Sequence, residues 1–515
     1  MTKTLLMWKS RIMGSLSINI RTFRLIRLIL INLFFLSVFA SYYNTAVVIH
    51  STGTLSMMVK QPQMYKSEVR EVVNIAPYEN GQSCNWTLIC ETLAAYNVTG
   101  IGSAFLFNYK SYYPSQYVPN QSPRDELALA IQAAHSHGLT VRVEFCVLYK
   151  SPMDEWKVKL DNNSLYNWLD PTNPEAREWI LNLTREIVTN YGIDDLSLDY
   201  IRYDDVNMPY TDTAKQMLEE YLNETITSWP GDFAPNGSRF SEFLQWRIIP
   251  INTLVKEIYD LAKSIKPSIT VSACVRYWAG SPGWVLASVG QDPTSWILGG
   301  YIDRLYAMTY RNTTSDVQTN INAYLQYATA GPNGAVEFIP YFVTYSQDEG
   351  WNLTVAQFSE FINLARSLGC DGYVVSAYMG PGVNPAISEP WPDIRPYLEA
   401  VNTEPIWTLY DIAVQYLNTT SVKISWKTTE PTNSSIEYSS NPLFNATLKY
   451  MTPSPYPGIY YWDMDYYPST IIQSNTALTT HEFTLTNLDN KIYFLRVQSN
   501  ISSLNVTSKV YTIKL

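Results

Sequence analysis

The chain has 515 residues, of which 46% are hydrophobic and 16% are charged. This composition supplies enough apolar material for a sizeable core and excludes a largely disordered chain. The formal net charge is −10 and the isoelectric point is near 5.1. Because an acidic surface repels phosphate backbones, we expect no nucleic-acid partner. The length fits one large domain followed by a smaller one.

Residues 1–40 predict export. Lys and Arg residues precede the apolar stretch Leu28–Ala40, and small residues surround Ala40. This is the pattern of a secretory signal peptide, and an uncleaved N-terminal membrane anchor is the alternative. Asn-X-Ser/Thr sequons recur along the rest of the chain, which favours a glycosylated protein. We therefore expect a secreted or cell-surface (extracellular) protein, with any membrane attachment made through its N-terminus.

A polar lead-in at residues 41–69 precedes a long region, 70–402, in which strand and helix patterns alternate. The strands are expected at 71–79, 100–107, 140–149, 195–203, 270–278, 302–310, 337–345 and 372–379. Eight strands separated by amphipathic helices indicate an α/β fold, the (β/α)8 TIM barrel. A doubly wound open sheet is the alternative, but no Gly-rich phosphate loop follows the first strand.

After a linker at 403–407, residues 408–515 change to short alternating stretches without helical periodicity. This pattern indicates a C-terminal all-β sandwich of the immunoglobulin or fibronectin kind. Trp426 stands where a buried core Trp is expected, and Tyr493 follows Leu488 at a spacing that suits a tyrosine corner. The region resembles a fibronectin type III domain, and this resemblance implies no chemistry.

The five cysteines do not suggest a disulfide framework, because their number is odd and no Cys-X-X-Cys is present. Cys84 and Cys90 are close enough in sequence to pair locally. Cys146 and Cys274 fall in apolar strands, where we expect them to act as small core residues.

The alternation of side chains along the barrel strands indicates which residues could be catalytic. Side chains of a barrel strand point alternately to the barrel interior and to the surrounding helices. In "DLSLDYIRY" this places Ser197 and Asp199 inward, with Asp199 at the carboxyl end, where such barrels carry their active sites. In "TVRVEFCVLY" it places Arg142 and Glu144 inward. Two carboxylates across one cavity are the minimum for glycoside hydrolysis.

The stretch "NWLDPTNPEAREWILNLTREIVTNYGIDDLSLDYIRYDD" resembles the core of the family 10 glycosyl hydrolase-like (GHL10) proteins, which are described as glycosidases. "AHSHGLTVRVEF" and "YIDRLYAMTY" fit the same family in order, and the likeness covers roughly residues 70–400. It implies a (β/α)8 hydrolase that acts on a glycosidic bond, with Asp199 as the catalytic carboxylate. The catalytic role of Glu144 follows from strand parity and not from the resemblance.

Aromatic faces bury the apolar face of a sugar ring, and several aromatic and basic residues fall at or just beyond strand ends. The expected substrate-binding residues are Arg202, Tyr203, Arg276, Trp278, Tyr310, Tyr345 and Tyr378. No metal or cofactor is expected, because the four His residues form no ligand motif. Carbohydrate is therefore the expected partner.

Other interpretations remain open for each carboxylate. Asp199 has a structural alternative, an ion pair with Arg202 or Arg276, and Glu144 has another, the neutralisation of Arg142. The general acid has further candidates in Asp204, Asp205, Asp348 and Glu349. The leading hypothesis is an exported glycoside hydrolase. One rival is a non-catalytic carbohydrate-binding protein on the same barrel. The other takes the likeness of the C-terminal sandwich to those attached to metallophosphatases as the guide to function, but the chain shows no His/Asp metal set.

Overall fold

The computed structural model describes residues 45–49, 55–61, 65–66, 68–276, 282–328, 336–346, 349–384, 391–403, 408–440, 447–453, 460–465, 469–501, 504–508 and 511–515. The predicted signal or anchor at 1–40 lies outside them, as does Trp278. Within these described ranges, no helix is long and apolar enough to cross a membrane.

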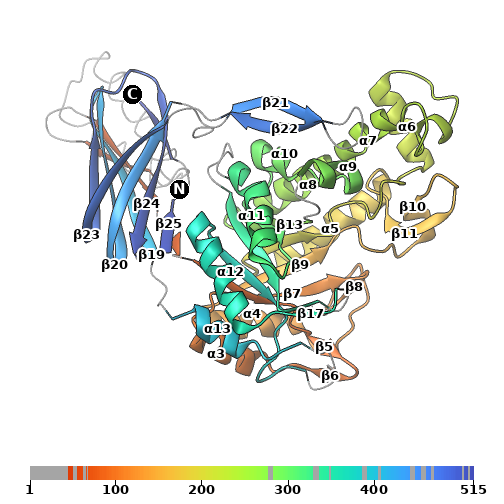
Figure 1. The fold of residues 1–515 in the computed structure, drawn as a ribbon, viewed down its shortest axis with the longest axis horizontal. Coiled ribbons are helices and arrows are strands. Elements are labelled where there is room, and N and C mark those ends of the chain that lie inside the picture. The colour runs from red at the N-terminus through yellow and green to blue at the C-terminus, as the bar shows by residue number, and fades with distance from the viewer. Residues whose placement is uncertain are drawn as a thin grey trace, which may run out of the picture.

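Eight parallel strands form a closed barrel, as predicted (Figure 1). They are β4 (Val69–Val73), β7 (Gly100–Phe107), β9 (Thr140–Cys146), β12 (Asp195–Asp199), β13 (Thr270–Val275), β14 (Arg304–Met308), β15 (Glu337–Val343) and β18 (Gly372–Ser376). Strand β4 pairs with both β18 and β7, so the sheet has no free edge. An open doubly wound sheet is therefore excluded.

The seam between the last and first strands depends on a glycine. Gly372 of β18 lies opposite Val69 of β4. A Cβ atom added to Gly372 would stand 2.0 Å from the Val69 carbonyl oxygen. Only glycine permits this close approach of two backbones, so the residue is needed for barrel closure.

A helix follows each strand and covers the outside of the barrel. These helices are α3 (Trp86–Ala95), α4 (Glu126–Ser136), α5 (Pro174–Asn190), α8 (Ile248–Ile265), α10 (Pro293–Gly299), α11 (Thr314–Ala328), α12 (Val355–Leu368) and α13 (Arg395–Val401). Their ends follow local chemistry. Asn173 caps α5 ahead of Pro174, and Thr354 forms a capping box with Gln357 at the start of α12.

The loops carry further short elements. Between β12 and β13 lie α6 (Asp212–Leu222) and α7 (Phe240–Trp246), and α9 (Pro282–Val289) follows β13. Short strands lie in the other loops: β5 (Tyr78–Glu79), β6 (Gln82–Ser83), β8 (Lys110–Ser111), β10 (Lys157–Lys159), β11 (Leu165–Leu169), β16 (Tyr345–Ser346) and β17 (Trp351–Asn352).

A separate antiparallel sheet contains the C-terminal strands and three strands from before the barrel. Its members are β1 (Thr45–Ile49), β2 (Leu55–Gln61), β3 (Tyr65–Lys66), β19 (Thr408–Asn418), β20 (Ser421–Ser439), β23 (Thr470–Leu485), β24 (Ile492–Ile501), β25 (Leu504–Thr507) and β26 (Tyr511–Lys514). Strands β2 and β3 pair with β19. The stretch predicted as a polar lead-in therefore supplies strands to this sheet.

The core of this second sheet contains the predicted buried tryptophan. Trp426 is buried and its indole N–H donates to Ser499 Oγ at 2.8 Å. The hydroxyl of Tyr493 accepts a hydrogen bond from the Asp489 backbone N–H at 3.0 Å. Burial of Trp426 is thus confirmed, while the fibronectin type III likeness stays a prediction. A hairpin of β21 (Thr447–Pro453) and β22 (Tyr460–Asp465) extends from this region, and β22 contacts α9 (Figure 1).

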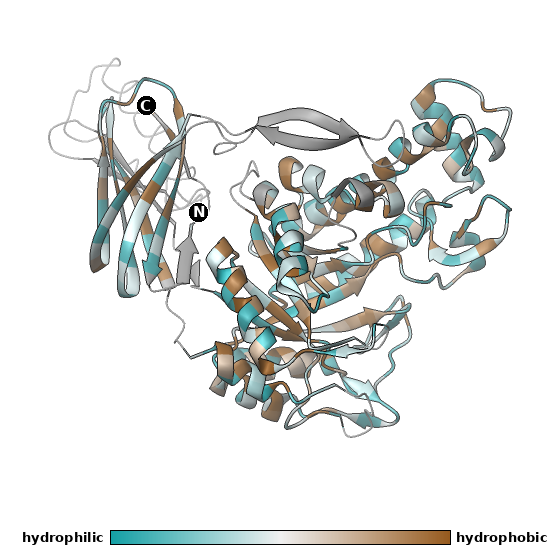
Figure 2. Cartoon of the chain, viewed as in Figure 1, coloured by the Kyte–Doolittle hydropathy of each residue, from teal (hydrophilic) through white to brown (hydrophobic). Residues whose placement is uncertain are grey.

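The predicted alternation of strand side chains is confirmed. Val143 and Leu198 belong to the large core between the barrel and its helices. Ser197 instead points inward, with its Oγ 3.6 Å from the sulfur of Cys274 on the next strand. Hydrophobic colour is accordingly concentrated along the barrel strands and on parts of the helices around them (Figure 2).

Candidate active site

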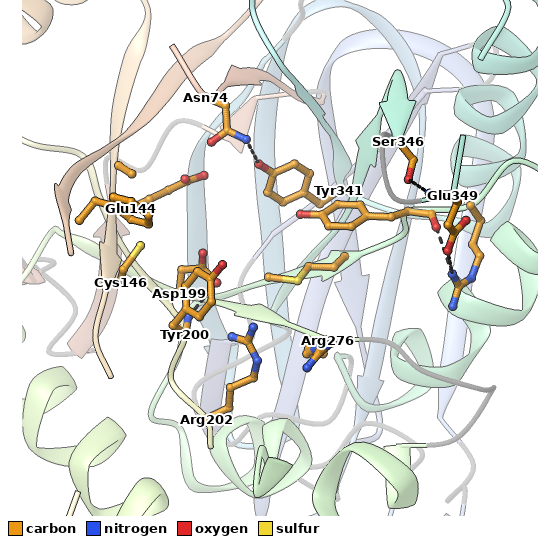
Figure 3. A pocket seen from close by; sticks show the side chains of 15 residues that line it. Asn74, Glu144, Cys146, Asp199, Tyr200, Arg202, Arg276, Tyr341, Ser346 and Glu349 are labelled. Atoms are coloured by element: carbon orange, nitrogen blue, oxygen red, sulfur yellow. Dashed lines mark hydrogen bonds and ion pairs between the residues drawn. The ribbon is translucent and has the colours of Figure 1, made fainter. Parts of the chain in front are cut away.

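A cavity of about 610 Å³ opens at the carboxyl ends of the barrel strands (Figure 3). It is lined by Asn74, Ala104, Phe107, Glu144, Cys146, Asp199, Tyr200, Arg202, Arg276, Met308, Tyr310, Arg311, Tyr341, Ser346 and Glu349. Barrels of this architecture place their active sites at this end. The cavity brings together both predicted carboxylates and three of the predicted binding residues.

Asp199 is the last residue of β12, and the chain turns sharply after it. Its Oδ1 accepts the backbone N–H of Tyr200 at 2.7 Å, and Tyr200 has a φ of 49°, in the left-handed region. Burial raises the pKa of Asp199, whereas the Arg202 charge and the Tyr200 N–H oppose this rise. A non-glycine residue in this conformation is costly and is common at functional sites, because strain there fixes a neighbouring group.

Glu144 lies on the neighbouring strand β9, opposite Ser197 and therefore one inward position below Asp199. Strand spacing and rise place the Cα atoms of the two carboxylate residues about 8 Å apart. Arg142 Nη2 donates to Glu144 Oε1 at 2.6 Å. Burial raises the Glu144 pKa to about 7, with the Arg142 charge lowering it and the Asp199 charge raising it further. The two carboxyl groups thus interact electrostatically.

These contacts can be compared with the structural, non-catalytic roles considered for Glu144 and Asp199. The ion pair between Arg142 and Glu144 fits the neutralising role considered for Glu144. For Asp199, by contrast, no ion pair is formed with any of the residues that the structure describes. The charges of Arg202 and Arg142 nevertheless favour its ionised form.

The predicted binding residues divide into two groups. Arg202, Arg276 and Tyr310 line the cavity. The other described ones lie outside its lining. Tyr203 is fully buried with Arg247 over its ring at 4.5 Å. The Tyr345 ring stacks edge-on against Trp391, and the Tyr378 hydroxyl donates to the Pro381 carbonyl at 2.7 Å.

Tyr203 was expected to bind substrate but is buried in the core, and the cause is local. The sequence predicts a strand through residue 203, but β12 ends at Asp199. The turn at Tyr200 breaks the alternation, so that Tyr200 and Arg202 line the cavity while Tyr203 enters the core. The inward and outward alternation of side chains along this segment therefore holds only as far as Asp199.

Several lining residues were missed from sequence. Tyr341 could have been found, because inward alternation along β15 includes it, and it packs in the barrel interior. Its hydroxyl accepts a hydrogen bond from Asn74 Nδ2 at 3.2 Å. Asn74 directly follows β4 and has a φ of 55°, which no sequence pattern indicates.

The remaining acid candidates lie differently. Glu349 lines the cavity, but it pairs with Arg311 at 3.7 Å and accepts the Trp351 indole N–H at 2.7 Å. Asp204 accepts the hydroxyl of Tyr166 and is not part of the lining. Asp205 is exposed, and Asp348 lies outside the described residues.

Metal-binding and thiol chemistry find little basis in the described part of the chain. It contains no group of three or more His, Cys, Asp or Glu side chains arranged to hold a metal ion. Cys84 and Cys90 are both buried and free. Cys146 is buried as predicted and also lines the cavity, where burial and Asp199 raise the pKa of its thiol.

Fold and cavity together define a class of site. A closed parallel barrel carries two carboxyl groups at the carboxyl ends of its strands, and their surroundings differ. Such a pair can divide the roles of proton donor and anionic base between its members.

Residues 108–331 match the family model described as "Glycosyl hydrolase-like 10". The chain is 28% identical over 125 residues to an S-layer-related protein of Niallia circulans, covering 22% of this chain and 8% of that protein. It is equally identical over 125 residues to the glycosyl hydrolase DigH of Escherichia coli K12, covering 24% and 23%. It is 25% identical over 211 residues to the glycosyl hydrolase YngK of Bacillus subtilis, covering 36% of each. The matches thus span well under half the length of these relatives.

Proposed function

We propose that this chain is an exported glycoside hydrolase that cleaves a glycosidic bond of a poly- or oligosaccharide. The observation that carries the proposal is the pair of carboxyl groups in one cavity, Asp199 and Glu144, whose surroundings differ. The family match at 108–331 and the names of the relatives support the same reaction. The apolar stretch before residue 41 is the basis for export.

Glu144 is assigned the general acid. A pKa of about 7 keeps a substantial fraction of this carboxyl protonated near neutral pH, so it can donate a proton to the departing glycosidic oxygen. Asp199 is assigned the anionic partner that either attacks the anomeric carbon or activates water, because the Arg202 charge and the Tyr200 N–H oppose the rise that burial causes in its pKa. Activity should therefore fall on the alkaline side near pH 7, as Glu144 loses its proton.

Arg202, Arg276 and Tyr310 are assigned to substrate binding from their places in the cavity lining. Tyr200 and Tyr341 add aromatic surface beside them. Aromatic faces and polar groups together suit a sugar ring, whose two faces are apolar and whose rim carries hydroxyls.

The test uses the exported part, from about Ser41, and a panel of polysaccharides and glycoprotein glycans. Newly formed reducing ends are measured for wild type, Asp199→Asn and Glu144→Gln. The general-acid role predicts a loss of about 10²- to 10⁴-fold for Glu144→Gln. Asp205→Asn is the matched control, because it removes a carboxylate six residues beyond Asp199, outside the lining. Release that persists unchanged in Asp199→Asn would contradict the proposal.

A non-catalytic carbohydrate-binding protein is the second candidate. The observation that favours it is the ion pair of Glu144 with Arg142, since a carboxylate committed to an internal partner is a poor proton donor. Glycans retained by all variants without release of reducing ends would favour this candidate.

A further inference from the structure

Arg202 stands out because its guanidinium is buried and forms no ion pair with the residues that the structure describes. The residue is only 6% exposed. Its Nε and Nη1 atoms are buried without a hydrogen-bond partner among the described residues, and it forms no ion pair with any of them. A buried guanidinium normally has carboxylate or carbonyl partners, because desolvation without them is costly.

A second guanidinium lies close to it. Arg276, which follows β13, lines the same cavity, and Figure 3 shows the two side chains next to each other on one side of it. Burial and then repulsion by Arg202 lower the pKa of Arg276. Two like charges that lie next to each other in a partly buried site favour an anion that contacts both.

The acidic groups nearby form hydrogen bonds with neutral groups and act on the two arginines only through their charge. Asp199 accepts the Tyr200 N–H, and Asp204 accepts the Tyr166 hydroxyl. The arginine on another part of the lining, Arg311, is paired with Glu349. Arg202 and Arg276 therefore bring two positive charges to one part of the cavity lining.

The orientation of Arg202 is held by an aromatic ring. Its guanidinium carbon lies 4.3 Å from the centre of the Tyr200 ring. Stacking of this kind restrains the plane of the guanidinium and leaves its N–H groups directed along that plane. A restrained guanidinium suits the two oxygens of a carboxylate or a sulfate, which it binds through paired charge-assisted hydrogen bonds.

From these contacts we propose that the cavity binds an acidic sugar, whose carboxylate or sulfate group lies against Arg202 and Arg276. The proposal deepens the proposed function and rests on it, since it names the substrate class as an acidic glycan. The anionic substituent faces β12 and β13, so the ring that carries it lies next to Asp199.

The test measures binding to the exported protein carrying Asp199→Asn, so that no probe is consumed. The probes are a galacturonic acid tetramer, its carboxyl-reduced counterpart, and a sulfated galactose tetramer with its desulfated form. Each pair has the same linkages and differs only in charge. Calorimetry on this background is repeated with Arg202→Gln, with Arg202→Lys, and with Arg311→Gln as the paired cavity arginine.

The expected result is that at least one acidic tetramer binds at least about tenfold more tightly than its neutral counterpart. Arg202→Gln should remove most of that difference, Arg202→Lys should restore part of it, and Arg311→Gln should have a smaller effect. The carboxylate and sulfate pairs then tell which anion is preferred. Equal binding of the acidic and neutral members of both pairs would overturn the inference. An equal loss of affinity for the acidic and the neutral member in Arg202→Gln would overturn it as well.

Hydrolysis of the same probes and of the polysaccharide panel is measured separately, with the protein that retains Asp199. If neutral glycans alone are cleaved and acidic probes show no preference, the hydrolase proposal stands and the acidic-sugar inference falls. If an acidic tetramer binds through Arg202 and nothing on the panel is cleaved, the inference stands and the hydrolase proposal falls.

Discussion

Two charged layers inside one barrel differ in how completely their charges are matched. In the lower layer, Arg304 contacts Glu71 at 3.0 Å, Asp195 at 3.2 Å and Glu337 at 2.7 Å. The hydroxyl of Tyr306 also donates to Glu71 and Asp195. This cluster, Glu71, Asp195, Arg304, Tyr306 and Glu337, we call the floor network.

The upper layer, at the mouth, is different. Arg202 has no ion pair among the described residues, and Asp199 accepts one backbone N–H. Removing one partner of a matched pair in a barrel interior is costly because it leaves a buried charge uncompensated, whereas a charge that is already unmatched costs stability and is typical of functional sites. We therefore expect the lower charges to contribute to stability and the upper ones to contact a ligand.

The largest expected effect comes from breaking the floor network. Arg304→Met leaves Glu71 and Asp195 buried without their main counter-charge, and it should lower the free energy of unfolding by about 3–5 kcal/mol. Urea unfolding at pH 7 measures this. Arg185→Met, which removes an exposed arginine that bonds Asn182 on α5, should change it by about 0.5 kcal/mol or less. A loss below about 1 kcal/mol for Arg304→Met would contradict the assignment.

The next largest effect is a pH dependence of the unfolding free energy, and it comes from Glu144. The folded pKa of Glu144, about 7, lies above its ordinary value of 4.5. A raised pKa contributes stability that is fully present below the unfolded value and is lost as the pH rises through about 7. From pH 4 to pH 8, wild type should therefore lose up to about 3 kcal/mol of unfolding free energy relative to Glu144→Gln. Parallel stability curves for the two proteins would show that Glu144 titrates normally in the folded state.

The smallest effect is expected at the mouth. Arg202→Gln removes an unmatched buried charge, so the free energy of unfolding should stay within about 1 kcal/mol of wild type or increase. The same urea experiment measures it beside Arg304→Met. A destabilisation as large as that of Arg304→Met would place Arg202 with the floor network and remove the contrast between the layers.

Much of the architecture could be predicted because its signals are local. Apolar periodicity located all eight barrel strands, and two-residue alternation directed Glu144 and Asp199 into the interior. Each of these signals depends only on neighbours in the chain and on the geometry of an extended strand.

The failures occur where alternation stops. The chain turns at Tyr200, which has a positive φ, and β12 ends before it, so Tyr203 enters the core and not the cavity where it was expected. Asn74, which directly follows β4, is itself in the left-handed region and lines the cavity. Asn tolerates the left-handed region, but a Tyr there carries no such signal, and its conformation depends on the packing that surrounds it.

By itself, the sequence determined the barrel, the inward direction of Asp199 and Glu144, and the family resemblance. Only the tertiary structure decided which charges meet. Glu71 and Arg304 are separated by 233 residues, and their contact exists because the sheet closes. The lack of an ion pair between Arg202 and any described residue is likewise a property of its surroundings, since pairing depends on every strand that reaches the mouth.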